Sequence, residues 1–289
     1  MISGGTGGIG LLAASALAAL GAETLLLSSR SGAVSPSEAC LLNHLCSVAP
    51  ATHRVRADVT DPGSVAGLVH AGQHLAPTQH LHGVVHAAQA PLRYTTLTQH
   101  TEGSFMSEFG VRALGAWHLH QATRGMPQLE LFAGVTSLNG LMGQGSNAAI
   151  SAGNLVVDGL VAARLAAGLP AQTLQFSRVA QIGSNAKNPL RYAAAVSAIR
   201  ELPVRLCNAF LRAALRPPRL PRPLLLADVH WRELQSQIGQ ELPVLRGLVG
   251  AARAAGDAEE QGVAPGGAGV GEACTAELLP PVRDMEELR

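Results

Sequence analysis

The sequence predicts an α/β domain built on a doubly wound parallel sheet, and three observations support this fold class. Short apolar segments with strand character alternate with longer segments of helical periodicity over about the first 250 residues. Such alternation is typical of parallel strands joined by crossover helices. A glycine-rich loop at residues 3–10 precedes the first helical segment. Apolar residues make up 47% of the chain and charged residues only 14%, as expected where helices bury both faces of a sheet.

The expected elements follow one another in a regular order. Only Met1 and Ile2 precede the glycine-rich loop, so the first strand is expected to be truncated. Helices are expected at 11–20, 37–48, after Asp61 and Pro62, at 104–123, 147–167 and from 230, and strands at 24–28, 53–57, 81–87, 129–135, 171–176 and 224–229. Residues 251–289 are rich in Ala, Gly, Glu and Pro without periodicity. This composition predicts a disordered tail or linker behind a domain of residues 1–250.

The glycine-rich loop consists of Gly4, Gly5, Thr6, Gly7, Gly8, Ile9 and Gly10. Between a strand and a helix, such a loop lets backbone N–H groups approach a pyrophosphate, which is the Rossmann-type arrangement for a dinucleotide. A plain tight turn is the alternative. Arg30, at the end of the next strand, favours NADP(H), because a guanidinium pairs with a 2′-phosphate where an acid would bind the 2′-hydroxyl of NAD(H). An exposed loop arginine is the alternative for Arg30.

Composition argues against several other kinds of protein. The net charge is +1 and no basic cluster is present, so nucleic acid is not an expected partner. Four cysteines are scattered without a CxxC pair, which favours a reducing, cytoplasmic location and gives no metal site. The longest apolar run, residues 11–27, is interrupted by Gly21 and Glu23 and falls short of a membrane span of about 20 residues. A signal peptide is not expected either.

Several short motifs are spread along the chain. They are residues 4–10, Ser29-Arg30, Ala57-Asp58-Val59-Thr60-Asp61, His86-Ala87-Ala88, residues 115–120 (GAWHLH), Thr136-Ser137, residues 154–158 and Gly168-Leu169-Pro170-Ala171. In order and spacing this set resembles the ketoreductase domains of polyketide and fatty acid synthases, within the short-chain dehydrogenase/reductase superfamily. The resemblance runs from residue 3 to about 250 and implies the short-chain reductase fold.

The resemblance also implies how a cofactor would lie. It implies that Ser29 and Arg30 lie at the 2′-phosphate end of NADPH, that Asp58 and Val59 lie beside the adenine, and that the segment of His86, Ala87 and Ala88 leads into the nicotinamide ribose loop. A turn or capping carboxylate is an equally good interpretation of Asp58.

For catalysis, the family uses a Ser and a Tyr that hold the carbonyl oxygen, a Lys that lowers the pKa of the Tyr, and an Asn in the proton path. Ser137 and Asn154 match two of these positions. The Tyr position, thirteen residues after the Ser, is Ile150, and the Lys position is Arg112. Isoleucine cannot donate a proton, and arginine keeps a charge without relaying protons. A solvated helix residue is the alternative for Arg112. Tyr94 and Tyr192 fall outside the helix expected to present the acid.

Two interpretations of function remain open. The first is NADPH-dependent reduction of a β-ketoacyl thioester on an acyl carrier protein, with impaired activity. The second is a catalytically inactive scaffold or interaction domain of a megasynthase, which would explain Ile150 and Arg112 as well. Other megasynthase domains are expected partners in both cases. A free-standing dehydrogenase is disfavoured because the Tyr-x-x-x-Lys pair is missing.

Overall fold

The structure is a computed structural model that describes residues 1–49, 51–93, 95–143, 147–182, 197–219 and 223–238. The chain divides into two compact units, one of Met1–Pro189 with Glu201–Ala227 and one of Leu190–Arg200 with Asp228–Arg289. The first unit contains the whole sheet. The expected tail at 251–289 lies outside the described residues, so the boundary at residue 250 stays a prediction.

The first unit is built on a seven-stranded parallel sheet with the order β3-β2-β1-β4-β5-β6-β7. This order reverses direction beside β1, which is the doubly wound pattern that the sequence predicts. β1 has only two residues and pairs with both β2 and β4. The strands are β1 (Ile2–Ser3), β2 (Leu25–Ser29), β3 (Thr52–Arg56), β4 (Gly83–His86), β5 (Leu131–Ser137), β6 (Gln172–Phe176) and β7 (Leu224–Leu226).

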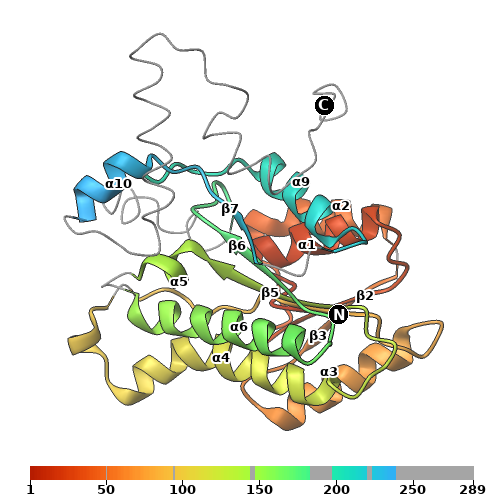
Figure 1. Cartoon of the computed structure of the whole chain (residues 1–289). Coiled ribbons are helices and arrows are strands. Elements are labelled where there is room, and N and C mark those ends of the chain that lie inside the picture. Colours follow the sequence, from red (N-terminus) through yellow and green to blue (C-terminus); the bar gives the residue numbers. More distant parts are fainter. Residues whose placement is uncertain (50, 94, 144–146, 183–196, 220–222, 239–289) are drawn as a thin grey trace. The chain divides into compact units, whose positions relative to one another are not determined.

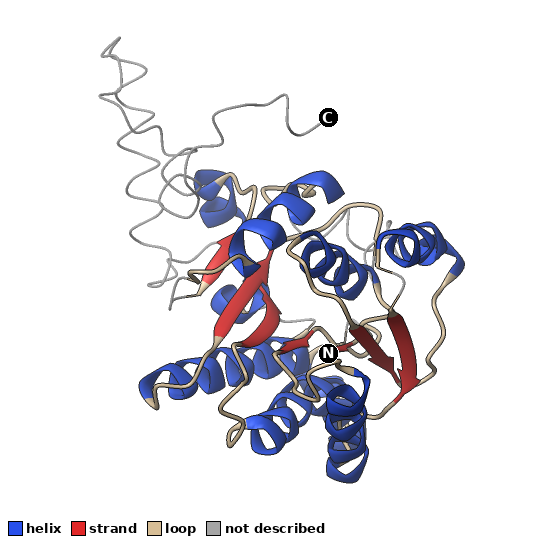
Figure 2. Ribbon diagram, turned by 90° about the vertical axis from the view of Figure 1, so that its right-hand side faces the viewer, coloured by secondary structure: helices blue, strands red, loops and turns tan. Residues whose placement is uncertain are grey.

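Helices cover both faces of this sheet (Figures 1 and 2). One layer contains α3 (Pro62–Leu75), α4 (Glu102–Thr123) and α6 (Ala148–Ala166), and the other contains α1 (Gly8–Ala19), α2 (Ala39–Val48) and α9 (Val204–Leu215). The short helix α5 (Leu138–Met142) follows β5, and 3-10 turns occupy Pro36–Glu38 and Leu97–Gln99. In the second unit, α10 (Trp231–Ile238) follows an antiparallel bridge between Ile199 and Val229.

The structure differs from the expected elements in two places. The first is α9, in a stretch between 177 and 223 to which the sequence analysis assigned no element. Its buried residues Cys207, Phe210 and Leu211 follow the three- and four-residue helical period, and Phe210 meets Phe176 of β6 edge-to-face with ring centroids 5.3 Å apart. β7 ends at Leu226 rather than at 229.

α6 is the one described helix whose length and hydropathy would allow it to cross a membrane. It packs against α4 within its layer and against β5 and β6 of the sheet, and its buried residues include Ile150, Asn154 and Val157. The valine is so close to β5 that a Cβ on Gly134 would lie 2.4 Å from its Cγ1. Core helices of water-soluble domains pass the same test of length and composition.

Candidate nucleotide and active site

The glycine-rich loop connects β1 to α1 and depends on two glycines that nothing larger could replace without movement. Gly4 has φ +70°, and a Cβ there would lie 2.5 Å from the backbone nitrogen of Ala88. A Cβ on Gly10 would lie 2.2 Å from the carbonyl oxygen of Gly4. The loop therefore packs closely against the residues that follow β4 and against the first turn of α1. Because glycines have no side chain, its backbone N–H groups stay accessible to a ligand.

A cavity of about 540 Å³ opens at this end of the sheet, where β1, β2, β3 and β4 end. In open α/β sheets this is the edge where ligands bind. The predicted site residues that line it are Gly4, Thr6, Ser29, Arg30, Asp58, Val59 and Ala88, whereas Gly5, Gly7, Gly8, Ile9, Gly10, His86 and Ala87 do not line it. The sequence interpretation missed Ser28, Ser31, Arg56, Ala57, Gln89 and Val111.

Asp58 is a turn carboxylate, which is one of the two roles considered for it, and its place beside the adenine of a cofactor stays a prediction. Its Oδ1 accepts hydrogen bonds from the backbone N–H (2.9 Å) and the hydroxyl (2.7 Å) of Thr60, which makes it a turn carboxylate. It also lines the cavity. The Thr60 hydroxyl bond is the main cause of a lowered pKa for Asp58, burial opposes it, and the charge of Arg30 adds to it. The carboxylate is therefore ionised and held in place.

His86 lies behind the cavity and is fully buried. Its Nε2 is 3.1 Å from the carbonyl oxygen of Arg112, which can only accept, so Nε2 carries the proton. Nδ1 then accepts from the hydroxyl of Ser3 at 2.7 Å. Burial, and secondly the charge of Arg112, lower the pKa of His86 to about 4. The neutral imidazole therefore joins β1, β4 and α4 as a structural link.

Ser137 and Asn154, the two matched catalytic positions, are in direct contact. Ser137 is the last residue of β5, and the side-chain amide of Asn154, on α6, donates to its Oγ at 2.9 Å. Ile150 lies one turn earlier on α6 and is only 2% exposed. Its side chain contributes neither donor nor acceptor. Tyr94 and Tyr192 lie outside the described residues.

Arg112 is not a solvated helix residue, because only 4% of its surface is exposed. Its Nη1 donates to the carbonyl oxygen of Val135 at 2.7 Å, and its Nη2 donates to the side-chain oxygen of Gln89. Gln89 lines the cavity, so it connects the cavity to this buried guanidinium. Burial lowers the pKa of Arg112 to about 10, which still leaves it cationic at neutral pH.

A half-buried carboxylate compensates part of that charge. Asp158, on α6, accepts from the Thr136 hydroxyl and from the Gln175 amide, each at 3.0 Å. Burial raises the pKa of Asp158, while these two hydrogen bonds and the charge of Arg112 oppose the rise. Asp158 was included in the motif at 154–158 from the sequence but was given no role, although its position four residues after Asn154 places it on the same helix face.

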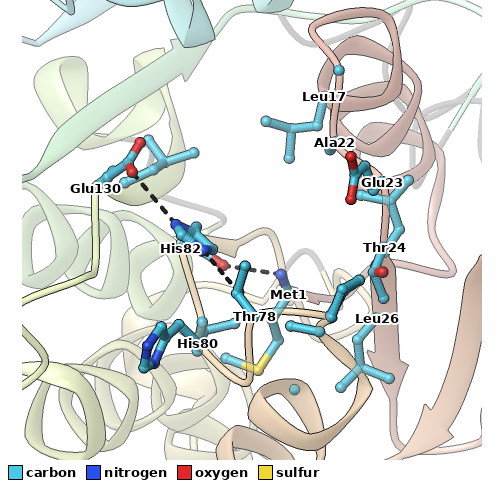
Figure 3. A pocket seen from close by; sticks show the side chains of 18 of the residues that line it. Met1, Leu17, Ala22, Glu23, Thr24, Leu26, Thr78, His80, His82 and Glu130 are labelled. Atoms are coloured by element: carbon cyan, nitrogen blue, oxygen red, sulfur yellow. Dashed lines mark hydrogen bonds and ion pairs between the residues drawn. The ribbon is translucent and has the colours of Figure 1, made fainter.

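A second cavity, of about 330 Å³, lies at the opposite, amino end of the strands (Figure 3). Its rim carries His82, whose Nδ1 is 3.4 Å from Oε1 of Glu130 and whose Nε2 is 3.1 Å from the hydroxyl of Thr78. None of the predicted site residues lines it. The cavity at the carboxyl ends is therefore the one that the sequence motifs identify.

The parallel sheet and the glycine-rich loop at the carboxyl end of β1 define the class of this protein as a Rossmann-type domain of the short-chain reductase fold. The family model described as the KR domain matches residues 1–181. The chain belongs to this ketoreductase domain family.

Similar proteins are large synthases. The chain is 36% identical over 184 residues to the PKS-NRPS hybrid synthetase acdB of Aspergillus candidus, covering 63% of this chain and 7% of that protein. It is 34% identical over 194 residues to highly-reducing polyketide synthase 1 of Aureobasidium melanogenum, covering 67% and 9%. The chain therefore spans less than a tenth of the length of these curated relatives.

Similar solved structures are ketoreductases. A ketoreductase from the first module of phoslactomycin biosynthesis in Streptomyces sp. HK803 is 26% identical with a TM-score of 0.73, over 84% of this chain and 56% of that one. The first ketoreductase of the tylosin polyketide synthase is 28% identical with a TM-score of 0.68, over 82% and 50%. These structures support the fold across most of the described residues.

Proposed function

We propose that this domain binds NADPH and reduces a β-ketoacyl thioester carried by an acyl carrier protein, at a rate far below that of an intact ketoreductase. The observation that carries the proposal is the cavity at the carboxyl ends of β1–β4, with Gly4 and Thr6 at its pyrophosphate end and Arg30 at its ribose end. These residues fit the shape and charge of NADPH. The similar proteins described above are large polyketide synthases, which supports a thioester on an acyl carrier protein as the substrate.

The cofactor, when bound, would supply a hydride to the carbonyl carbon. The protein must then hold the carbonyl oxygen and provide a proton as negative charge develops on it. The hydroxyl of Ser137 can donate one hydrogen bond to that oxygen, because Asn154 donates to Ser137 and so leaves its proton free. Ile150 supplies neither a second donor nor the proton, and Arg112, committed to Val135 and Gln89, does not relay one. The alkoxide formed by hydride transfer would therefore take its proton from water, which makes the step slow.

An inactive scaffold of a megasynthase is the second candidate. The burial of Ile150 and the tight hydrogen bonding of Arg112 favour it, because both changes are accommodated within a well-packed α4–α6 layer. A domain that keeps its fold while losing its catalytic residues can still serve as a structural part of a larger synthase.

Two measurements on the purified chain test the proposal. Quenching or enhancement of NADPH fluorescence measures binding, and the loss of absorbance of NADPH in the presence of trans-decalone or a diffusible β-ketoacyl thioester measures reduction. We expect binding together with slow, enzyme-dependent oxidation. Binding of NADPH without any turnover would favour the inactive scaffold. A kcat of about 1 s⁻¹ or more would refute the proposal that activity is impaired. If NADPH does not bind, the proposed cofactor is wrong.

A further inference from the structure

Two arginines approach the same end of the nucleotide cavity from neighbouring strands. Arg30 follows β2, and Arg56 is the last residue of β3. In the parallel ladder Arg56 lies directly beside Ser29. Its Nε donates to the carbonyl oxygen of Arg30 at 3.4 Å, and both side chains line the cavity. The Arg56 side chain therefore extends from its own strand to the turn that carries Arg30.

That turn has the shape needed to receive Arg56. Gly32 has φ +68°, and a Cβ there would lie only 3.0 Å from Cγ of Arg56. The N–H of Gly32 donates to Oγ of Ser29 at 3.0 Å, which fixes the turn in this conformation. A larger residue at position 32 would press on the arginine, so the glycine keeps the space in which Arg56 lies.

The charges at this end of the cavity are predominantly positive. Asp58 is the only acidic residue among the described residues that line it, and its carboxylate is occupied by two hydrogen bonds from Thr60. Neither Arg30 nor Arg56 forms a salt bridge with any carboxylate in the described part of the chain. Two guanidinium groups are thus available to an anion at this end of the cavity, which Ser29 and Ser31 also line.

We propose that Arg56 is a second ligand, beside Arg30, of the 2′-phosphate on the adenosine ribose of NADP(H), and so a specificity-determining residue. The proposal depends on the proposed cofactor and goes beyond it in assigning this residue. A phosphate monoester carries nearly two negative charges at neutral pH and offers three acceptor oxygens. Two guanidinium groups match that charge, and each can bind in the paired geometry that arginine favours with phosphate. A cofactor without the 2′-phosphate gains nothing from Arg56.

Calorimetric titration of the full chain tests this with five ligands: NADPH, NADH, adenosine 2′,5′-bisphosphate, adenosine 3′,5′-bisphosphate and adenosine 5′-monophosphate. We expect Arg56→Ala to weaken binding of NADPH and of the 2′,5′-bisphosphate about tenfold or more, the usual effect of losing a charge-assisted hydrogen bond. Binding of NADH and of the 5′-monophosphate should change less than about twofold. Arg54→Ala is the matched control, because Arg54 is an exposed residue of the same strand that does not line the cavity.

The outcomes separate this inference from the proposed function. If Arg56→Ala acts no more strongly than Arg54→Ala, or weakens NADH as much as NADPH, Arg56 does not bind the 2′-phosphate. Equal or tighter binding of adenosine 3′,5′-bisphosphate would also overturn the assignment to the 2′ position. If the unmodified chain binds none of these nucleotides, the proposed cofactor falls together with the inference.

Discussion

Position 150 determines how far the proposed reduction can proceed. Ser137 and Asn154 are joined by a hydrogen bond, but the buried Ile150, one turn before Asn154 on α6, gives no proton donor at the position where the family has its Tyr. General acid catalysis contributes about 10²–10⁴-fold to such reactions. The chain is therefore expected to reduce ketoacyl thioesters very slowly.

The substitution Ile150→Tyr should restore more activity than any other single change, by about 10²-fold or more. The rate of NADPH oxidation with trans-decalone measures this, and Ile150→Phe is the matched control because it adds the ring without the hydroxyl. Combining Ile150→Tyr with Arg112→Lys should exceed the sum of the two separate free-energy effects, since a lysine can both stabilise a tyrosinate and relay protons. Equal rates for the Tyr and Phe variants would show that position 150 does not hold the acid.

Arg30 should give the cofactor site its preference for NADPH over NADH. Its charge-assisted pairing with the 2′-phosphate is worth about 1.5–3 kcal/mol, or roughly tenfold or more in affinity. The dissociation constants of the two cofactors should therefore differ for the unmodified chain and converge in Arg30→Ala. Unchanged preference in that variant would leave Arg30 as an ordinary exposed loop residue.

The buried, neutral His86 makes stability depend on pH. Its pKa is lowered to about 4 in the fold, from 6.5 in the unfolded chain, so the unfolded state binds the proton more tightly. Its contribution to the free energy of unfolding is fully present above pH 6.5 and is lost as the pH falls toward 4, by about 3 kcal/mol in total. Urea unfolding at pH 7 and pH 4.5 measures this. His86→Gln should flatten the dependence, whereas His53→Gln, at an exposed position of β3, should not.

Among the elements, the β1–α1 loop depends most on backbone shape. Gly10→Ala places a methyl group 2.2 Å from the carbonyl oxygen of Gly4, so the loop must move and nucleotide affinity should fall at least tenfold. Gly67→Ala is the control: Gly67 is an exposed residue of α3 with no atom near its Cβ position, so alanine there should stabilise the helix by about 1 kcal/mol. Calorimetric titration with NADPH and thermal unfolding distinguish the two effects. Full nucleotide affinity in Gly10→Ala would mean that the loop does not bind the pyrophosphate.

The sequence predicted most elements within about two residues of where they lie, because strand–helix alternation is a local signal. It assigned no element at α9, although Val204, Cys207, Phe210 and Leu211 have helical spacing. Among the site residues, the glycine-rich loop and Arg30 could be found from local sequence motifs. Arg56 and Gln89 could not, because the register of β3 beside β2 places Arg56 at the cavity and the contact with Arg112 identifies Gln89.

For the molecule as a whole, residues 251–289 are predicted to be dispensable for folding and for nucleotide binding. These residues lie outside the described part of the chain, and the prediction depends on their composition and lack of periodicity. A chain ending at residue 250 should keep the NADPH affinity and the midpoint of thermal unfolding of the full chain. Limited proteolysis should remove this segment first. A truncated chain that fails to fold would show that the segment packs on a domain.

The link from Ser3 through His86 to Arg112 offers an internal reporter on the whole site. The Nε2 proton of His86 is shielded from water and held by the carbonyl oxygen of Arg112, while Nδ1 holds the strand that leads into Gly4. Solvent can replace that proton only when β1, β4 and α4 separate, so its exchange rate follows the opening of the domain rather than local fraying. The exchange rate of this one imidazole proton therefore reports how often β1, β4 and α4 separate.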